Sequence, residues 1–175
     1  MKQEDLERLS SARNCPNGDL SGSDLSGSYL KGANLLGANL KDADFSSCDM
    51  ESANLGGADL YGANLDGTKL RFANLAGVNL ENAKLDQADL HRANMKGARL
   101  IAASLGDVDL RFANLEGADL RKVHLGRANP KEGNLKKANL GAASLKGADL
   151  SFTEMEGAKL CNTTMPDSQI VYKDR

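Results

Sequence analysis

An apolar residue recurs at every fifth position of this 175-residue chain, without a slip, at thirty-one positions from Leu20 to Ile170. Twenty-four of these are leucine, and the others are four methionines, one phenylalanine, one isoleucine and Pro130. The residue two positions earlier is Gly, Ala, Ser, Thr, Cys or Val in every case, and it is Ala in nineteen. The residue between them is Asp or Asn in twenty cases. The chain therefore repeats one five-residue unit: a small residue, Asp or Asn, Leu, and two variable residues.

A period of five excludes both regular secondary structures over this length. An α-helix turns 100° per residue, so steps of five would spread the leucines around its circumference. A strand alternates its side chains between two faces, and five is an odd number. A short extended piece does fit, with the small residue and the leucine facing inward, followed by a two-residue corner. Glycine is frequent at the second corner position, as at Gly57 and Gly97, which suits a positive φ.

The unit resembles the A(D/N)LXX repeat of the pentapeptide-repeat family. The likeness covers residues 18–170 and includes Asp-Leu-Ser-Gly at 19–22 and Ala-Asn-Leu-Asp-Gly at 63–67. The resemblance implies an all-β fold, a right-handed quadrilateral β-helix in which four units close one lap of the solenoid. Thirty-one units then make nearly eight coils. Each coil can bury its leucines only by stacking on its neighbours, so an isolated coil is not expected to fold.

A solenoid with a bare end would expose apolar layers, so caps are expected. Near the N-terminus, Leu6 and Leu9 have helical spacing, acidic residues occupy the first turn, and Arg13 lies near the last turn. A short capping α-helix is therefore predicted. The expected divisions of the chain are a helical cap and turn at 1–17, the β-helix at 18–170 and a C-terminal tail at 171–175.

Residues twenty apart lie above one another in such a coil, and one resulting column consists entirely of asparagine: Asn34, Asn54, Asn74, Asn94, Asn114 and Asn134. Stacked amides can hydrogen-bond from coil to coil, as in other stacked β-structures. The neighbouring corner column is mostly glycine. This side of the rod is therefore predicted to be flat, and its amides to be structural.

A second column is rich in aromatic residues, with a phenylalanine at every other coil from 72 to 152: Phe72, Arg92, Phe112, Glu132, Phe152 and Tyr172. These positions are assigned to an outward corner, with the phenylalanines two coils or about 10 Å apart. Two interpretations stay open. The rings either pack at their own corner, against the stem of Arg92, or they form a docking stripe made of Phe72, Arg92, Phe112 and Phe152. Complete enclosure of Phe72 and Phe112 would exclude the docking stripe.

A basic segment surrounds Pro130, with Glu132 as the only acid between residues 120 and 140: Arg121, Lys122, Arg127, Lys131, Lys136 and Lys137. These side chains are either solvated on different sides of the coil or form a patch for an anionic partner. Pro130 cannot donate a ladder hydrogen bond, and Gly133 lacks a side chain. A local bulge is therefore expected there.

Motifs for catalysis, cofactors and metals are missing from the sequence. His91 and His124 are assigned to different sides of the coil, so they form neither a metal site nor a nucleophile and base pair. The three cysteines, Cys15, Cys48 and Cys161, are an odd number without a CxxC pair, which implies neither a disulfide framework nor a zinc site. No GxGxxG or P-loop opens a helix. The sequence predicts no catalytic, cofactor-binding or metal-binding residues, and an enzyme is the least favoured interpretation.

Charge separates the remaining functions. The net charge is −2, from 22 Lys and Arg against 24 Asp and Glu, which disfavours nucleic-acid binding by the whole surface. No stretch approaches the roughly 20 apolar residues that span a bilayer. The favoured interpretation is a non-enzymatic rigid scaffold or protein–protein interaction module with an unknown protein partner, monomeric or weakly dimeric. The resemblance supplies an alternative, protection of DNA gyrase by imitation of duplex DNA, but such a mimic should be strongly acidic and carry loops that this chain lacks.

The resemblance leaves two kinds of compartment open: the thylakoid lumen or periplasm, and the cytoplasm. The family is abundant in photosynthetic bacteria and in the thylakoid lumen. Residues 13–22 resemble a segment that reads Cys-Pro-X-Cys-Asp-Leu-Ser-Gly and follows an export signal in several lumenal or periplasmic members. Gly18 stands here in place of the second cysteine, which removes a local disulfide. Acidic residues near the start also replace the apolar stretch of a secretory signal.

Overall fold

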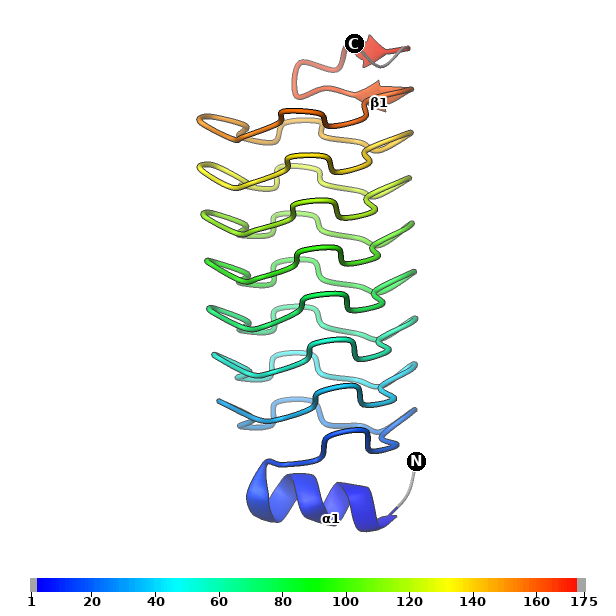
Figure 1. Ribbon diagram of the computed structural model, residues 1–175, viewed down its shortest axis with the longest axis vertical. Helices are drawn as coiled ribbons and strands as arrows, with labels where there is room; N and C mark the ends of the chain where they lie inside the picture. The colour runs from blue at the N-terminus through cyan, green and yellow to red at the C-terminus, as the bar shows by residue number, and fades with distance from the viewer. Residues whose placement is uncertain (1–2, 173–175) are drawn as a thin grey trace.

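In the computed structural model, the described residues 3–172 form a straight rod of stacked four-sided coils (Figure 1). Parallel bridges join residues twenty positions apart, from Asn14 paired with Asn34 to Ser144 paired with Thr164. The bridges recur every five residues, so each coil has four sides and each side holds one bridge. The extended piece on each side is too short to count as a strand, although the bridges link the pieces as a parallel sheet would.

Leucines and small residues fill the rod from end to end, as the repeat predicts. From Leu35 to Leu145, every inward Leu, Met and Phe side chain is at most 3% exposed. The small residues that precede them, such as Ala53 and Ala98, are equally enclosed. Burying one leucine contributes about 1.5–3 kcal/mol, so every side of every coil adds to the stability of the whole stack.

Each unit also satisfies its backbone N–H groups, and this explains the preference for Asp and Asn. In the unit 53–57, the second, third and fifth N–H groups donate to carbonyls of adjacent coils, and the first closes a turn onto the carbonyl of Met50. The fourth N–H, that of Gly56, donates to Oδ1 of Asn54 at 3.3 Å. All twenty Asp and Asn residues at this position accept the same bond, with N···O distances of 2.8–3.5 Å. A short side chain that reaches the N–H two residues ahead is needed here.

The corners have the geometry of type II turns. At all thirty corners from Asn17 to Asn162, the second corner residue has a positive φ and the first does not. Glycine supplies twelve of these residues, and eighteen are other amino acids. For a residue other than glycine, this left-handed backbone conformation costs about 1–2 kcal/mol. Phe72 and Phe112 therefore occupy a corner position whose backbone conformation is unfavourable for them.

The predicted helix covers the N-terminal end of the rod (Figure 1). It is α1 (Gln3–Ala12), and its Leu9 is 1% exposed. The buried carboxylate of Asp5 accepts the backbone N–H of Asp19 at 2.9 Å, which joins the helix to the first coil. Arg13 lies after the helix and not in its last turn: it has a φ of 50° and donates its N–H to the carbonyl of Leu9 at 2.8 Å, which ends the helix.

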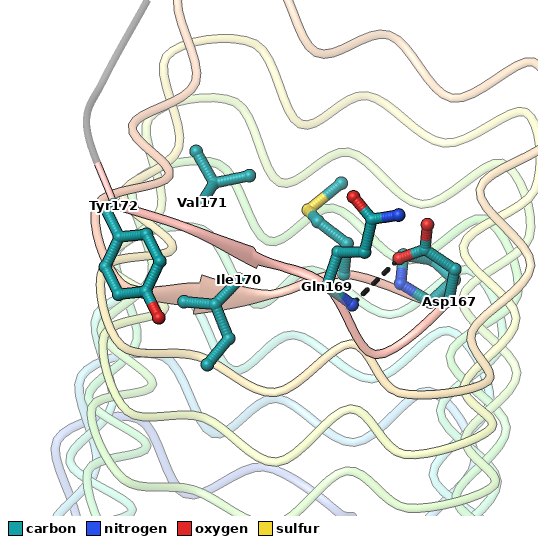
Figure 2. A pocket seen from close by; sticks show the side chains of 7 residues that line it. Asp167, Gln169, Ile170, Val171 and Tyr172 are labelled. Atoms are coloured by element: carbon teal, nitrogen blue, oxygen red, sulfur yellow. Dashed lines mark hydrogen bonds between the residues drawn. The ribbon is translucent and has the colours of Figure 1, made fainter.

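A short antiparallel hairpin lies at the C-terminal end. It pairs β1 (Thr163–Thr164) with β2 (Ile170–Val171), and the N–H of Gln169 donates to the Asp167 carboxylate at 3.0 Å within the connecting loop (Figure 2). Val171 therefore belongs to the hairpin. The rest of the predicted tail is Tyr172, which is exposed, and residues 173–175, which lie outside the described residues.

This end of the rod is more open than the other. The inward residues of the last coil, including Leu150 and Leu160, are only partly buried. The hairpin borders a shallow hollow of about 720 Å³, which is lined by Met165, Pro166, Asp167, Gln169, Ile170, Val171 and Tyr172 (Figure 2). Within residues 3–172, no helix is long and apolar enough to cross a membrane.

Pro130 takes the inward place of a leucine without shifting the period. It is buried, and the bridges continue at steps of twenty on both sides of it. Between residues 14 and 164, the one bridge missing from the series is that of Asn129 with Asp149, because proline has no N–H to donate. The expected bulge is therefore wrong, since no residue is inserted.

Gly133 is the adjustment that accommodates this proline. A Cβ at position 133 would lie 2.8 Å from the Pro130 carbonyl oxygen and 3.3 Å from that of Ala113. We expect Gly133→Ala to lower the free energy of unfolding by about 1–3 kcal/mol, because the backbone must shift. Gly126→Ala is the matched control: its Cβ would meet nothing closer than 4.0 Å, so its effect should stay within about 0.5 kcal/mol. Equal losses for the two variants in urea unfolding would contradict this explanation.

Candidate interaction ridge

One corner of the rod carries alternating aromatic and charged side chains, which we call the aromatic ridge. Its outer line consists of Phe72, Arg92, Phe112, Glu132 and Phe152. Beside it runs a line formed by the residues that precede the first four: Arg71, His91, Arg111 and Lys131. Bridges at Lys69, Asp89, Asp109 and Asn129 keep these coils in register. Adjacent strands lie about 4.8 Å apart, so successive phenylalanines are separated by about 9.6 Å.

The phenylalanines of the ridge are partly open to solvent. Phe72 is 48% exposed, Phe112 is 42% exposed and Phe152 is 81% exposed. Neither Phe72 nor Phe112 is enclosed by the protein, so the condition that would exclude a docking stripe is not met. Each of these two rings packs in part against its own corner and leaves the remainder of its surface available for contact.

His91 joins the first two phenylalanines, a contact that sequence reasoning missed. Its ring is edge-on to Phe72, with centroids 6.2 Å apart and an interplanar angle of 87°, and to Phe112, at 5.4 Å and 79°. The sequence placed His91 and His124 on different sides of the coil but did not relate His91 to the phenylalanines. His124 does stand on another side of the rod. The spacing along the sequence could have indicated this contact, because position 91 follows Phe72 by nineteen residues and precedes Phe112 by twenty-one. Both separations are one residue from a full coil.

The imidazole of His91 is partly removed from water. Its Nδ1 is buried and has no hydrogen-bond partner in the described part of the chain. Burial lowers the pKa of His91 below its ordinary value of 6.5, and the nearby Arg71 lowers it further, while Asp109 acts in the opposite direction. The neutral ring is therefore the form that fits between the two phenylalanines.

Acidification is expected to loosen this contact. The pKa of His91 is lower in the folded than in the unfolded chain, so stability is lost as the pH falls below about 6.5 and the loss is complete below the folded-state pKa. The pKa of Asp109, which faces His91, lies below its ordinary value of 3.8, so this carboxylate stays ionised over that pH range. Urea unfolding should give a lower free energy of unfolding at about pH 5.5 than at about pH 7.5. This difference between the two pH values should be smaller in the His91→Gln variant. This assignment would be contradicted if the free energy of unfolding of His91→Gln decreased with acidification as much as that of the wild type. An NMR titration midpoint of His91 at or above 6.5 would also contradict it.

Cations lie over the phenylalanine rings. The Arg71 Cζ is 5.9 Å from the ring centre of Phe72, and the Arg92 Cζ is 5.3 Å from that of Phe112. The Lys131 Nζ is 5.9 Å from the ring centre of Phe152. Such contacts are attractive at separations up to about 6 Å. The ridge therefore combines apolar surface with positive charge.

The four cations of the ridge differ in their carboxylate partners. Arg71 lies 3.4 Å from Asp89, and Arg111 lies 2.6 Å from Asp109. Neither Arg92 nor Lys131 has a carboxylate within 4 Å among the described residues. These two charges are the ones most available to a partner.

The side of the rod that follows the ridge in the chain is the predicted asparagine column. The amide of Asn74 donates to Asn54 at 2.9 Å, and that of Asn134 donates to Asn114 at 3.2 Å. Further bonds of this kind join Asn34 to Asn14, Asn54 to Asn34 and Asn94 to Asn74. Five of the six steps from Asn14 to Asn134 are therefore bonded, and among the described residues the step from Asn94 to Asn114 is the exception. The predicted amide ladder is confirmed over these steps. The column is uncharged as far as Asn134 and then continues with Glu154, which lies beside Phe152 and Glu132.

The basic segment is distributed over all four corners. Arg121 and Lys122 occupy one corner, Arg127 a second, Lys131 the ridge, and Lys136 and Lys137 the fourth. Three of the six are held by carboxylates: Arg121 by Asp119 at 2.7 Å, Arg127 by Asp107 at 2.7 Å and Lys136 by Glu154 at 3.0 Å. The structure therefore brings only Lys131 to the ridge.

The cysteines and histidines do not assemble into a reactive site in the described part of the chain. Cys48 is buried and donates its S–H to the carbonyl of Leu25, whereas Cys161 is exposed near the other end. Among residues 3–172, no three side chains of His, Cys, Asp or Glu are grouped so that they could hold a metal ion.

Comparison with models of known protein families gives a match over most of the chain. A family model described as pentapeptide repeats, in eight copies, matches residues 19–57, 53–92, 73–111, 93–129 and 132–165. No curated protein matches the sequence significantly.

Solved structures include similar chains at modest superposition. HetL, a pentapeptide repeat protein involved in heterocyst differentiation regulation in the cyanobacterium Nostoc sp. strain PCC 7120, is 26% identical with a TM-score of 0.29, and the match covers 95% of this chain and 97% of HetL. Rfr23 from the cyanobacterium Cyanothece 51142 is 25% identical with a TM-score of 0.35, over 89% and 92% of the two chains. A pentapeptide repeat protein of the Arabidopsis thaliana thylakoid lumen is 27% identical with a TM-score of 0.26, over 66% and 71%.

Proposed function

Since the chain belongs to the pentapeptide-repeat family, whose fold is a right-handed quadrilateral β-helix, we propose that it is a non-enzymatic rod that binds a protein partner along its aromatic ridge. The observation that carries the proposal is the line of partly exposed phenylalanines at 48%, 42% and 81%, with arginine and lysine over the rings. Aromatic residues and arginine dominate the binding energy of protein interfaces.

The rigidity of the rod supports this proposal. The ridge residues stand on coils that are bonded above and below, so little conformational entropy is lost when a partner binds. The ridge extends over about 19 Å from Phe72 to Phe152, four coils of about 4.8 Å each. Most remaining apolar exposure is scattered, as at Leu36 and Tyr61, which stand on two other corners.

The test is capture of partners from extracts of the organism that encodes the protein, with three baits. The wild type is compared with a Phe72→Ser, Phe112→Ser double variant and with a Leu36→Ser, Tyr61→Ser control, whose replaced side chains are 46% and 41% exposed. We expect a partner that the wild type and the control retain and the ridge variant loses, with at least about tenfold weaker binding once that partner is purified. The same partners on all three baits would refute the proposal.

A further inference from the structure

The geometry of the ridge points to one kind of partner: we infer that it binds an acidic, proline-rich segment that lies along the rod in the polyproline II conformation. This inference rests on the proposed function, because it names the chemistry that the same ridge would recognise. Three properties of the ridge carry it: the spacing of the phenylalanines, their partial exposure and the sign of the charge between them.

Spacing selects the conformation of the segment. The ridge presents a ring every two coils, which is about 9.6 Å. Polyproline II has three residues per turn and rises 3.1 Å per residue, so every third residue faces the same way at intervals of about 9.3 Å. An α-helix presents like-facing residues every seven positions, at about 10.5 Å, and a strand every two, at about 6.7 Å. Over the two intervals from Phe72 to Phe152, the mismatch is about 0.6 Å for polyproline II and about 1.8 Å for a helix.

Partial exposure suits a flat apolar ring as the occupant. Phe72 and Phe112 are fixed at their corners by His91 and leave about half of their surface open. A proline ring can cover that remaining surface without entering a pocket. A segment already in polyproline II also loses little entropy on binding, which is why aromatic surfaces recognise it elsewhere.

Charge selects the composition of the segment. Arg71, Arg92, Arg111 and Lys131 stand beside the rings, and Asp89 and Asp109 are each already paired with one of these arginines. Glu132 and Glu154 flank the Phe152 ring, so the positive charge is concentrated between Phe72 and Phe112. Arg92 and Lys131 lack such a carboxylate among the described residues, so acidic residues of the segment would meet them between the prolines. A second copy of this chain on the ridge would set these same cations against each other, which is unfavourable.

Direct binding of synthetic peptides tests this inference. The probes are a fluorescent peptide of four Pro-Pro-Glu repeats, the same peptide with Lys in place of Glu, and an acidic amphipathic helical peptide with leucine at every seventh position. By fluorescence anisotropy at low salt, we expect the wild type to bind the Pro-Pro-Glu peptide at least about tenfold more tightly than either other peptide. Phe112→Ser should weaken this binding about tenfold, and Tyr61→Ser, on another corner, should leave it unchanged.

A gain of affinity gives a sharper result than a loss. Glu132 is the one acid in the outer line of the ridge and lies between Phe112 and Phe152. Glu132→Arg should tighten binding of the Pro-Pro-Glu peptide about threefold to tenfold and weaken that of the lysine peptide. Arg92→Glu should have the opposite effects, and both should shrink as salt is added.

Several results would overturn the inference. These are tighter binding of the helical peptide, binding of the Pro-Pro-Glu peptide that Phe112→Ser leaves intact, no binding of any probe at millimolar concentration, or dimerisation of the protein that Phe112→Ser abolishes. The proposed function is separable from each of them. If capture of a partner still depends on Phe72 and Phe112, the ridge docks a protein of other chemistry, and only the choice of segment fails.

Discussion

Replacing Leu75 with alanine in the middle of the rod will lower the free energy of unfolding by about 3–5 kcal/mol. Leu75 is 0% exposed, and Leu55 and Met95 occupy the same inward column one coil below and one coil above. Bridges hold the backbone on both sides, at Asn54 and Asn94, so the surrounding coils cannot close the cavity. The full cost of lost contacts is therefore retained.

Leu160→Ala is the matched control for this prediction. Leu160 is also an inward leucine, but it lies in the last coil and is only partly buried, so its loss should cost about 1–2 kcal/mol. Chemical denaturation followed by far-UV circular dichroism measures both variants. Stacked repeats need not unfold in one step, so the midpoint and slope are compared as well as the extrapolated free energy. Equal losses at Leu75 and Leu160 would show that burial in the stack does not set the stability.

Deleting one five-residue unit will have a large effect on binding only where the unit lies inside the ridge. Each unit forms one side of a coil, so removal of residues 93–97 shifts every later residue by one side. Phe112 and Phe152 then lie on an adjacent corner, while Phe72 stays on the original one. The coil can still close, because all four sides place a small residue and a large apolar residue inward. We expect at least about tenfold weaker partner or peptide binding, since one aromatic anchor and the contact of His91 with Phe112 are lost.

The control for this deletion is removal of 53–57. This unit also begins with Ala-Asn and also contributes one side of a coil, but it precedes the ridge, so Phe72, Phe112 and Phe152 stay aligned. The two deletions should lower stability by similar amounts, as measured by chemical denaturation. Equal binding by the two deletion variants would contradict the assignment of the ridge as one continuous surface.

The large features of the fold could be predicted from the repeat because every unit makes the same choice. A leucine at each fifth position and a small residue two before it leave one set of side chains to bury, and the columns follow once the coil has twenty residues. The asparagine ladder and the capping helix were predictable for this reason. The role of Asp and Asn was not, because the bond that the Gly56 N–H donates to Asn54 Oδ1 depends on the turn that follows each leucine.

The ridge itself was only half predictable. Its phenylalanines could be placed on one corner, but their exposure could not be known, because the cover comes from side chains nineteen to twenty-one residues away. His91 is one such side chain, since it lies in the line beside the phenylalanines and reaches diagonally between two coils. The bulge expected at Pro130 failed for a related reason: Gly133 and the neighbouring coils absorb the proline without inserting a residue.

By itself, the periodicity of the sequence determined which side chains face inward, because this depends only on counting along a regular repeat. The length of each coil, and with it the residues that stack in each column, was implied by the resemblance to the pentapeptide-repeat family. The tertiary structure alone decided how much of Phe72 and Phe112 remains exposed, that His91 lies between them, and which cations of the basic segment are held by carboxylates of a neighbouring coil. These properties arise from contacts between coils, where the distance in space is short and the separation along the chain is about twenty residues. A periodic pattern specifies the register of such contacts but not the rotamers that make them.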